Sequence, residues 1–161
     1  HRDANGHQHK QASQQQGNPA SSAPASRIDP GLLAKVTIAT PNEHEIGVVV
    51  GEEEQQAAIS RMLLAGTETV LVTLGAQGVL WATQESQQRV PAFQVPAVDT
   101  TAAGDAFNGG LACALGRGLG MAEAIQYANG VAALSVTRMG AQPSLPTEDE
   151  LRRFAEEVAG K

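Results

Sequence analysis

The sequence is poor in cysteine and in aromatic residues, and it contains no long hydrophobic run. Its 161 residues include one cysteine, Cys113, and only 3% are Phe, Trp or Tyr. One cysteine excludes an internal disulfide and fits a reducing compartment. Because Cys113 lies in an apolar helical stretch, we expect it to be a small residue of the core. No apolar run approaches the roughly 18 residues of a membrane-spanning helix, and no signal-peptide pattern is present. These absences predict a soluble, cytoplasmic protein.

Two common phosphate-binding motifs are also missing. There is no Walker A lysine motif, and the glycines at 116, 118 and 120 have the wrong spacing for the dinucleotide motif and end a helix instead of opening one. The formal net charge of −6 disfavours nonspecific binding to nucleic acid or to an anionic membrane. The hydrophobic content of 42% is sufficient for the core of one domain, or of part of a larger domain.

The chain divides into a polar start and a patterned remainder. Residues 1–27 are rich in Gln, Ser, Ala, His and Asn and offer little to bury, which predicts a disordered or degenerate arm. Its histidines are interpreted as part of a solvated tail, because no cysteine or carboxylate cluster accompanies them. Residues 28–161 alternate strand and helix patterns, which predicts an α/β fold.

Several elements can be placed on these patterns. The apolar run 70–72 is typical of a strand buried on both faces of a parallel sheet. Strands are also expected at 36–40 and in a hairpin of 79–83 and 88–91. Helices are expected at 29–35, 46–66, 105–115, 121–136 and after a capping box at Thr147 and Glu150, the last with Leu151, Phe154 and Val158 facing inward.

The most informative stretch is Asp99-Thr-Thr-Ala-Ala-Gly-Asp-Ala-Phe-Asn-Gly109, a strand end and tight turn followed by a helix. The small residues Ala102, Ala103 and Gly104 let a ligand approach the backbone, and their N–H groups lie at the positive end of the helix, where anions bind. A carboxylate at Asp105 would repel a phosphate unless it takes a proton from a hydroxyl group. This combination indicates a sugar kinase without a P-loop. The alternative is a capped helix without chemistry.

The same stretch resembles the second signature of the ribokinase-like (PfkB) carbohydrate kinases, D-T-x-[GA]-A-G-D. The resemblance implies a three-layer αβα sandwich with a mostly parallel sheet, of which residues 28–161 would form the C-terminal, nucleotide-binding part. It also implies that Asp105 contacts the sugar hydroxyl and is the catalytic base, and that Ala102, Ala103 and Gly104 form an anion hole.

Two further segments resemble nucleotide-site motifs of that family. Asn42 and Glu45, in T-P-N-x-x-E, resemble the motif that orders Mg²⁺ and the phosphates; a capped helix start is the alternative. The segment T-L-G-x-x-G resembles the lining of the nucleotide site, and a simple turn is the alternative. The nucleotide-binding residues implied by the resemblance are Asn42, Thr73, Leu74, Gly75, Ala76, Gln77, Gly78, Gly104, Asp105 and Asn129. For Asn129, a buried amide with satisfied hydrogen bonds remains open.

The loop 137–146 resembles the T-R-x-G-A-Q-P-S-x-P of the ribokinase branch. There the loop and the Asp-Thr turn bind a monovalent cation, normally K⁺, mostly through backbone carbonyl groups. Carried over, the cation ligands would be Asp99, Thr101, Ser135, Arg138, Gly140 and Ser144. An ordinary loop is the alternative.

The resemblance therefore implies ATP-dependent phosphorylation of D-ribose at the 5-hydroxyl, with Mg²⁺ and K⁺ as cofactors. However, the family's sugar pocket, hinge and lid lie in an N-terminal half that nothing here resembles. Three alternatives follow: a catalytically silent nucleotide-binding or interaction module, a kinase for fructose or ketodeoxygluconate, or a chain that needs a partner, either a second copy or a missing N-terminal half.

Overall fold

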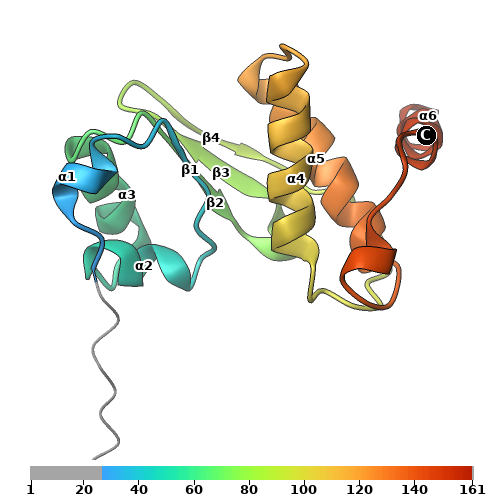
Figure 1. The fold of residues 1–161 in the computed structure, drawn as a ribbon, viewed down its shortest axis with the longest axis horizontal. Helices are drawn as coiled ribbons and strands as arrows, with labels where there is room; N and C mark the ends of the chain where they lie inside the picture. Colours follow the sequence, from blue (N-terminus) through green and yellow to red (C-terminus); the bar gives the residue numbers. More distant parts are fainter. Residues whose placement is uncertain (1–26, 161) are drawn as a thin grey trace, which may run out of the picture.

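A computed structural model describes residues 27–160. The expected N-terminal arm therefore falls, except for Arg27, outside the described residues. A four-stranded sheet lies between two helical layers (Figure 1). In this part of the chain no helix is long and apolar enough to cross a bilayer.

The sheet has the order β1-β2-β3-β4, with bounds Ile38–Ala39, Thr69–Thr73, Val79–Ala82 and Gln87–Val90. Strands β1 and β2 are parallel, with Ile38 opposite Thr69, whereas β2–β3 and β3–β4 are antiparallel. The predicted hairpin is confirmed, but within residues 27–160 the sheet is mixed rather than mostly parallel. The reason is that the connections 74–78 and 83–86 are too short for the crossover that parallel pairing requires.

Alternate residues of the central strand β2 face the two layers. Val70 and Val72 join the core formed with α2 (Glu45–Val50) and α3 (Gln55–Leu64), and Leu71 joins the core formed with α4 (Ala103–Gly116) and α5 (Met121–Val136). All three side chains are fully buried, as the unbroken apolar run predicted. The predicted three-layer α/β arrangement is thus confirmed.

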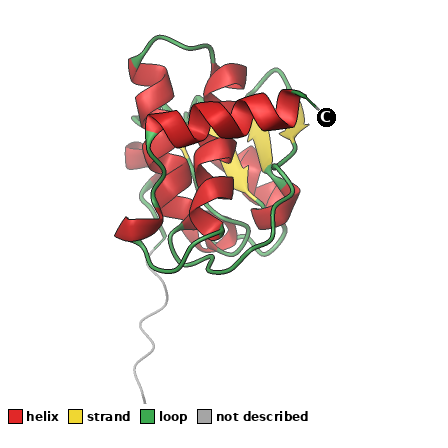
Figure 2. Ribbon diagram, turned by 90° about the vertical axis from the view of Figure 1, so that its right-hand side faces the viewer, coloured by secondary structure: helices red, strands yellow, loops and turns green. Residues whose placement is uncertain are grey.

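The remaining helices lie outside these packed pairs. A short α1 (Pro30–Leu33) begins at its cap Asp29, and α6 (Glu148–Ala159) packs beside α5. Figure 2 shows this side of the molecule, with α6 nearest the viewer. The capping box at Thr147 and Glu150 is confirmed: the Thr147 hydroxyl accepts from the Glu150 N–H, and the Glu150 carboxylate accepts from the Thr147 N–H.

The strand end expected before the Asp99 turn is wrong, because residues 91–98 form no strand. Three further expectations were also wrong. The helix expected over 46–66 is divided, because Gly51 ends α2 with a φ of 65° and the Glu54 carboxylate caps α3 through the N–H groups of Gln56 and Ala57. Cys113 is exposed, because the buried face of α4 carries Ala106, Phe107, Gly110, Leu111 and Ala114, and residue 113 points away from it. Val158 is also exposed, whereas Leu151 is the buried residue of α6.

Candidate nucleotide site

Three of the predicted nucleotide-binding segments, the T-L-G-x-x-G turn, the start of α4 and the part of α5 around Asn129, meet around one cavity of about 210 Å³. Its walls come from the end of β2, the turn after it, the segment 92–97, the start of α4 and one face of α5. Among the predicted residues it is lined by Thr73, Gly75, Ala76, Gly78, Ala103, Gly104 and Asn129. The predicted residues Leu74, Gln77, Asn42, Ala102 and Asp105 do not line it. Leu74 is a core residue instead, and the Gln77 amide oxygen accepts a hydrogen bond from Arg89 at 2.9 Å.

The N-terminus of α4 leaves backbone donors open beside this cavity. The N–H of Ala103 donates to Thr100 O at 3.1 Å, and the N–H of Ala106 donates to Ala102 O at 2.8 Å. No hydrogen bond from the N–H groups of Ala102, Gly104 or Asp105 is found within residues 27–160. Since these N–H groups have no partner among the described residues, they are available to a phosphoryl group, and the N-terminus of a helix attracts such an anion.

Gly104 is a glycine that the fold itself does not demand. It is helical, with no positive φ, and a Cβ placed on it would meet nothing within 4 Å. It is exposed and lines the cavity. The unusual backbone angles that glycine permits are therefore not used, and the bare backbone leaves room for a ligand.

Asp105 is exposed in the first turn of α4, next to the open donors. Its carboxylate forms no hydrogen bond with any other described residue, so nothing in this part of the chain competes for its lone pairs. The position suits a base that accepts a proton from a bound hydroxyl group.

Asn129 combines the two interpretations left open by the sequence. Its side chain is buried and its Nδ2 donates to Pro91 O at 3.1 Å, as expected of a satisfied core amide. It also lines the cavity, on the same face of α5 as Ala132, Ala133 and Val136. These four positions have the spacing of one helix face. Small residues on a face that also carries an amide were therefore a sequence signal for the lining residues that the family motifs did not include.

The segment 92–97 is another wall that the sequence motifs did not predict. Phe93 and Val95 line the cavity, and Phe93 also packs edge-on against Phe154 of α6 at 5.2 Å. Pro91 and Pro96 bracket this irregular stretch and interrupt regular strand pairing. Two prolines around alternating apolar residues were the available signal.

The Asn42–Glu45 turn reaches the same sheet edge as the nucleotide segment. An isolated parallel bridge pairs Asn42 with Thr73, and the Thr73 N–H donates to Pro41 O at 3.0 Å. The turn lines a second cavity, on the other side of this edge, together with Leu32 and Val48.

The side chains of this turn cap it reciprocally. Asn42 Oδ1 accepts from the N–H groups of His44 and Glu45 at 2.9 and 2.8 Å, and Glu45 Oε2 accepts from the Asn42 N–H at 3.0 Å. The capped start that the sequence left as an alternative is therefore present. Glu45 Oε1 accepts no hydrogen bond in the described part of the chain. Residues 27–160 contain no cluster of three His, Cys, Asp or Glu side chains, so a Mg²⁺ ion here would depend on this carboxylate, phosphates and water.

Asp99 joins its own turn to the loop 137–146. Its Oδ1 accepts from Thr101 N–H at 2.9 Å and from Thr101 Oγ1 at 2.6 Å, and its Oδ2 accepts from Gly140 N–H at 3.0 Å. The Thr101 hydroxyl contributes most, with the two N–H groups, to lowering the pKa of Asp99 to about 2. Val136 O also accepts from the N–H groups of Val98 and Asp99. The two segments predicted to share a cation thus lie side by side.

The hydroxyl groups of Ser135 and Ser144 are buried and occupied. Ser135 donates to Ala132 O at 2.8 Å, and Ser144 donates to Ala141 O at 2.6 Å. By contrast, no described N–H or hydroxyl donates to the carbonyl groups of Arg138, Gly140 and Ser144. Free backbone carbonyl groups are suitable ligands for a weakly hydrated monovalent cation. Carbonyl groups are also the ligands that the family resemblance implies for this loop.

The comparisons with known proteins show the family to which the chain belongs. The sequence profile described as pfkB family carbohydrate kinase matches residues 2–148. The chain is 42% identical over 139 residues to the ribokinase of Haemophilus influenzae, covering 83% of this chain and 45% of that protein. It is 35% identical to the deoxyribokinase of Salmonella typhimurium, covering 82% and 45%. It thus spans about half the length of the curated relatives it matches.

Solved structures resemble the chain at similar coverage. The crystal structure of ribokinase from Thermotoga maritima is 40% identical, with a TM-score of 0.77 over 83% of this chain and 47% of that one. A protein of E. coli assigned as a ribokinase II, in complex with ATP and Mg²⁺, is 30% identical with a TM-score of 0.73, over 80% and 42%. A fructokinase double mutant of Vibrio cholerae, with fructose, ADP and potassium bound, is 32% identical with a TM-score of 0.71, over 76% and 42%.

Proposed function

The chain belongs to the pfkB family of carbohydrate kinases, and we propose that it carries the nucleotide side of an ATP-dependent kinase that phosphorylates D-ribose at the 5-hydroxyl. The observation that carries this proposal is the uncapped start of α4. There the free N–H groups of Gly104 and Asp105 lie beside a cavity, next to an exposed carboxylate. Donors and a base at one point are what phosphoryl transfer to a hydroxyl group requires.

In this mechanism Asp105 accepts the proton of the sugar 5-hydroxyl as the sugar oxygen attacks the γ-phosphorus of ATP. The bond between the γ-phosphorus and the bridging oxygen of the β-phosphate breaks, and ADP leaves. The free N–H groups at the start of α4 stabilise the negative charge that develops on the transferred group. Gly75 and Gly78 bring bare backbone to the adenosine part of the nucleotide, and Thr73 and Asn129 line the same cavity. Phosphoryl transfer needs little more from the protein than this positioning and charge neutralisation.

Two cations complete the proposal. Glu45, with Asn42, would hold Mg²⁺ partly through water, and the bound Mg²⁺ would neutralise phosphate charge. The free carbonyls of the loop 137–146 and the Asp99 turn would hold K⁺. The ATP–Mg²⁺ complex of the E. coli relative and the potassium complex of the V. cholerae fructokinase support these assignments for the family. A cytoplasmic location stays a prediction.

Ribose is favoured as the sugar by the T-R-x-G-A-Q-P-S-x-P loop, which resembles the ribokinase branch, and by the 42% identity to a ribokinase. The relatives also include a deoxyribokinase and a fructokinase, so the test compares D-ribose with the sugars of those two enzymes. A second candidate function is a nucleotide-binding module without turnover, and one observation favours it: the cavity is lined by residues of the nucleotide side, and the base Asp105 does not line it.

The test is ADP release by the purified chain with ATP, Mg²⁺ and K⁺, with and without D-ribose, 2-deoxy-D-ribose or D-fructose. Calorimetric binding of an ATP analogue is measured in parallel. Release that depends on D-ribose most strongly supports the proposal, and preference for another sugar corrects the substrate. Binding without sugar-dependent release supports the module instead. A folded chain that neither binds nor releases nucleotide would overturn both candidates.

A further inference from the structure

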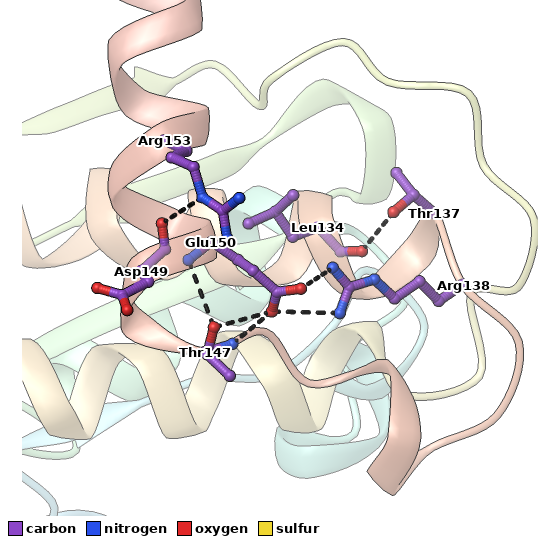
Figure 3. A network of polar contacts seen from close by, with 7 residues as sticks. All are labelled: Leu134, Thr137, Arg138, Thr147, Asp149, Glu150 and Arg153. Atoms are coloured by element: carbon purple, nitrogen blue, oxygen red, sulfur yellow. Dashed lines mark hydrogen bonds and ion pairs between the residues drawn. The ribbon is translucent and has the colours of Figure 1, made fainter.

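The C-terminal helix α6 is tied to the candidate cation loop by a bidentate ion pair. Arg138 NH2 lies 2.7 Å from Glu150 Oε1, and Arg138 NH1 lies 3.3 Å from Glu150 Oε2 (Figure 3). Both side chains are half-buried, with 37% and 30% of their surface exposed. Paired, planar contacts of this kind fix orientation as well as distance.

The Glu150 carboxylate serves the helix and the loop together. Its Oε2 also accepts from the N–H and the hydroxyl of Thr147, at 2.8 and 3.1 Å. Arg138 first, and then these Thr147 donors, lower the pKa of Glu150 to about 2, so the carboxylate stays charged at neutral pH. One charged group thus joins the first turn of α6 to Arg138, the second residue after the end of α5.

Two residues beyond Arg138, the loop makes its contact with the kinase signature. The Gly140 N–H donates to Asp99 Oδ2, and Asp99 Oδ1 holds Thr101 immediately before α4. Gly140 has a φ of 88°, and the carbonyl groups of Arg138 and Gly140 accept no hydrogen bond from described residues. A segment with so few bonds of its own depends on anchors at its sides for its conformation.

Apolar contacts fix α6 against the layer that carries the cavity. Phe154 packs edge-on against the cavity residue Phe93, with ring centroids 5.2 Å apart and planes at 78°. Leu151 approaches Gly130 so closely that a Cβ there would lie 3.0 Å from its Cδ1. The helix is therefore a fixed support for Arg138. The match to the family profile ends at residue 148, so Glu150, Leu151 and Phe154 lie outside it.

We propose that Arg138 and Glu150 are a positioning pair through which α6 holds the loop 137–146 against the Asp99 turn and keeps its carbonyl groups in place for a monovalent cation. This goes beyond packing, the only role that the sequence assigned to the C-terminal helix. It rests on the proposed function for the cation itself. The link from α6 through Glu150, Arg138 and Gly140 to Asp99 stands on contacts of the chain alone.

The chain offers a matched control on the same helix turn. Arg117 and Glu148 form an equally bidentate pair, at 2.9 and 3.0 Å, which joins the end of α4 to α6 without touching the loop. Glu148→Gln removes the same charge from the first turn of α6 as Glu150→Gln does. It therefore reproduces effects on the helix dipole and on global stability.

The experiment compares Glu150→Gln, Arg138→Gln and Glu148→Gln with the unaltered chain 1–161. Arg138→Gln keeps the Thr147–Glu150 cap and every backbone carbonyl, so it isolates the bridge. The first readout is hydrogen exchange of the Gly140 amide by NMR without ligand, well below each variant's unfolding temperature. The second readout is the affinity for an ATP analogue in the presence of Mg²⁺, measured over a range of K⁺ concentrations. Its K⁺ midpoint is the concentration at which half of the K⁺-dependent gain in affinity is reached.

We expect Gly140 exchange to accelerate about fivefold or more in Glu150→Gln and Arg138→Gln, and the K⁺ midpoint to rise by a similar factor. Glu148→Gln should leave both within about twofold, a change smaller than the weakest typical coupling. Unchanged exchange in Arg138→Gln, or equal acceleration in Glu148→Gln, overturns the positioning role. If nucleotide binding of the unaltered chain shows no K⁺ dependence, the proposed cation fails, and the exchange result still decides whether α6 holds the loop.

Discussion

Two turns that precede helices, residues 41–45 after β1 and residues 99–105 after the irregular segment 91–98, treat the first backbone donors of those helices in opposite ways. In the first turn, Asn42 accepts from the N–H groups of His44 and Glu45, and Glu45 accepts from the Asn42 N–H in return. In the second turn, the side chain of Ala102 has no atom that can accept a hydrogen bond, and α4 begins without a side-chain cap.

Most of the other described helices begin with a capping side chain, although α5, which follows Gly120, begins without one. Asp29 caps α1, Glu54 caps α3 and Thr147 with Glu150 caps α6. A capping oxygen stabilises a helix by about 1 kcal/mol but occupies the donors that an anion would use. The open start of α4 therefore gives up local stability at the one turn where the family signature lies. Because α5 also begins without a side-chain cap, the open start of α4 indicates a binding site only together with the cavity that Ala103 and Gly104 line.

The largest effect is expected for Asp105→Asn, which tests whether the uncapped turn 99–105 carries the catalytic base. This substitution keeps the size of the side chain and removes the base. We expect ribose-dependent ADP release to fall by about 10²- to 10⁴-fold, the usual contribution of a general base. Affinity for an ATP analogue should be largely kept, because the N–H donors remain. Turnover equal to that of the unaltered chain would eliminate Asp105 as the base.

A second change fills the space over the open turn. Gly104→Ala should weaken binding of an ATP analogue about tenfold, equivalent to about 1.4 kcal/mol, because a methyl group stands where the ligand approaches. Stability should not fall, since alanine favours helix over glycine by up to about 1 kcal/mol.

The matched control is Gly109→Ala. Gly109 is an exposed helical glycine of the same α4, a Cβ on it would also meet nothing within 4 Å, and it does not line the cavity. This variant should gain similar stability and bind nucleotide normally. If both variants lose affinity equally, the effect belongs to the helix and not to ligand approach.

The capped turn is tested by a pair of changes that separate its two roles. Asn42→Ala removes the oxygen that accepts two N–H bonds and should lower the free energy of unfolding by about 1 kcal/mol, measured by urea denaturation. Glu45→Gln keeps an oxygen for the Asn42 N–H but loses the charge. It should change stability less and raise the Mg²⁺ concentration needed for nucleotide binding. An unchanged Mg²⁺ requirement would mean that the turn is only a cap.

The smallest expected effect is the pH dependence of the Asp99 link. The pKa of Asp99 is lowered from 3.8 to about 2 in the fold, so the unfolded chain takes up this proton at higher pH. Stability from this carboxylate is therefore full above about pH 4 and is lost as the pH falls toward 2. Asp99→Asn should flatten this part of the urea-denaturation profile. Glu53→Gln, at an exposed carboxylate without a hydrogen bond to described residues, should leave the profile unchanged.

How far the sequence could predict this molecule depended on the range of each signal. The short helix that starts near residue 29, the Thr147–Glu150 box and the hairpin of β3 and β4 depend on residues a few positions apart, and the structure confirms them. The division of one expected helix at Gly51 was also a local signal, present in the sequence but outweighed by the apolar residues around it. The exposure of Cys113 depended on which face of α4 meets α5 and the sheet, which helical spacing leaves ambiguous in an alanine-rich helix.

By itself, then, the sequence determined the family signature, the caps and the alternation of strands and helices, because short-range sterics and hydrogen bonds set these features. The tertiary structure decided the rest: the cavity that joins segment 92–97 to a face of α5, the Asp99–Gly140 bond across 41 positions and the pairing of Arg138 with Glu150. These contacts join residues far apart in the chain, and only the packing of the two helical layers on one sheet brings them within reach.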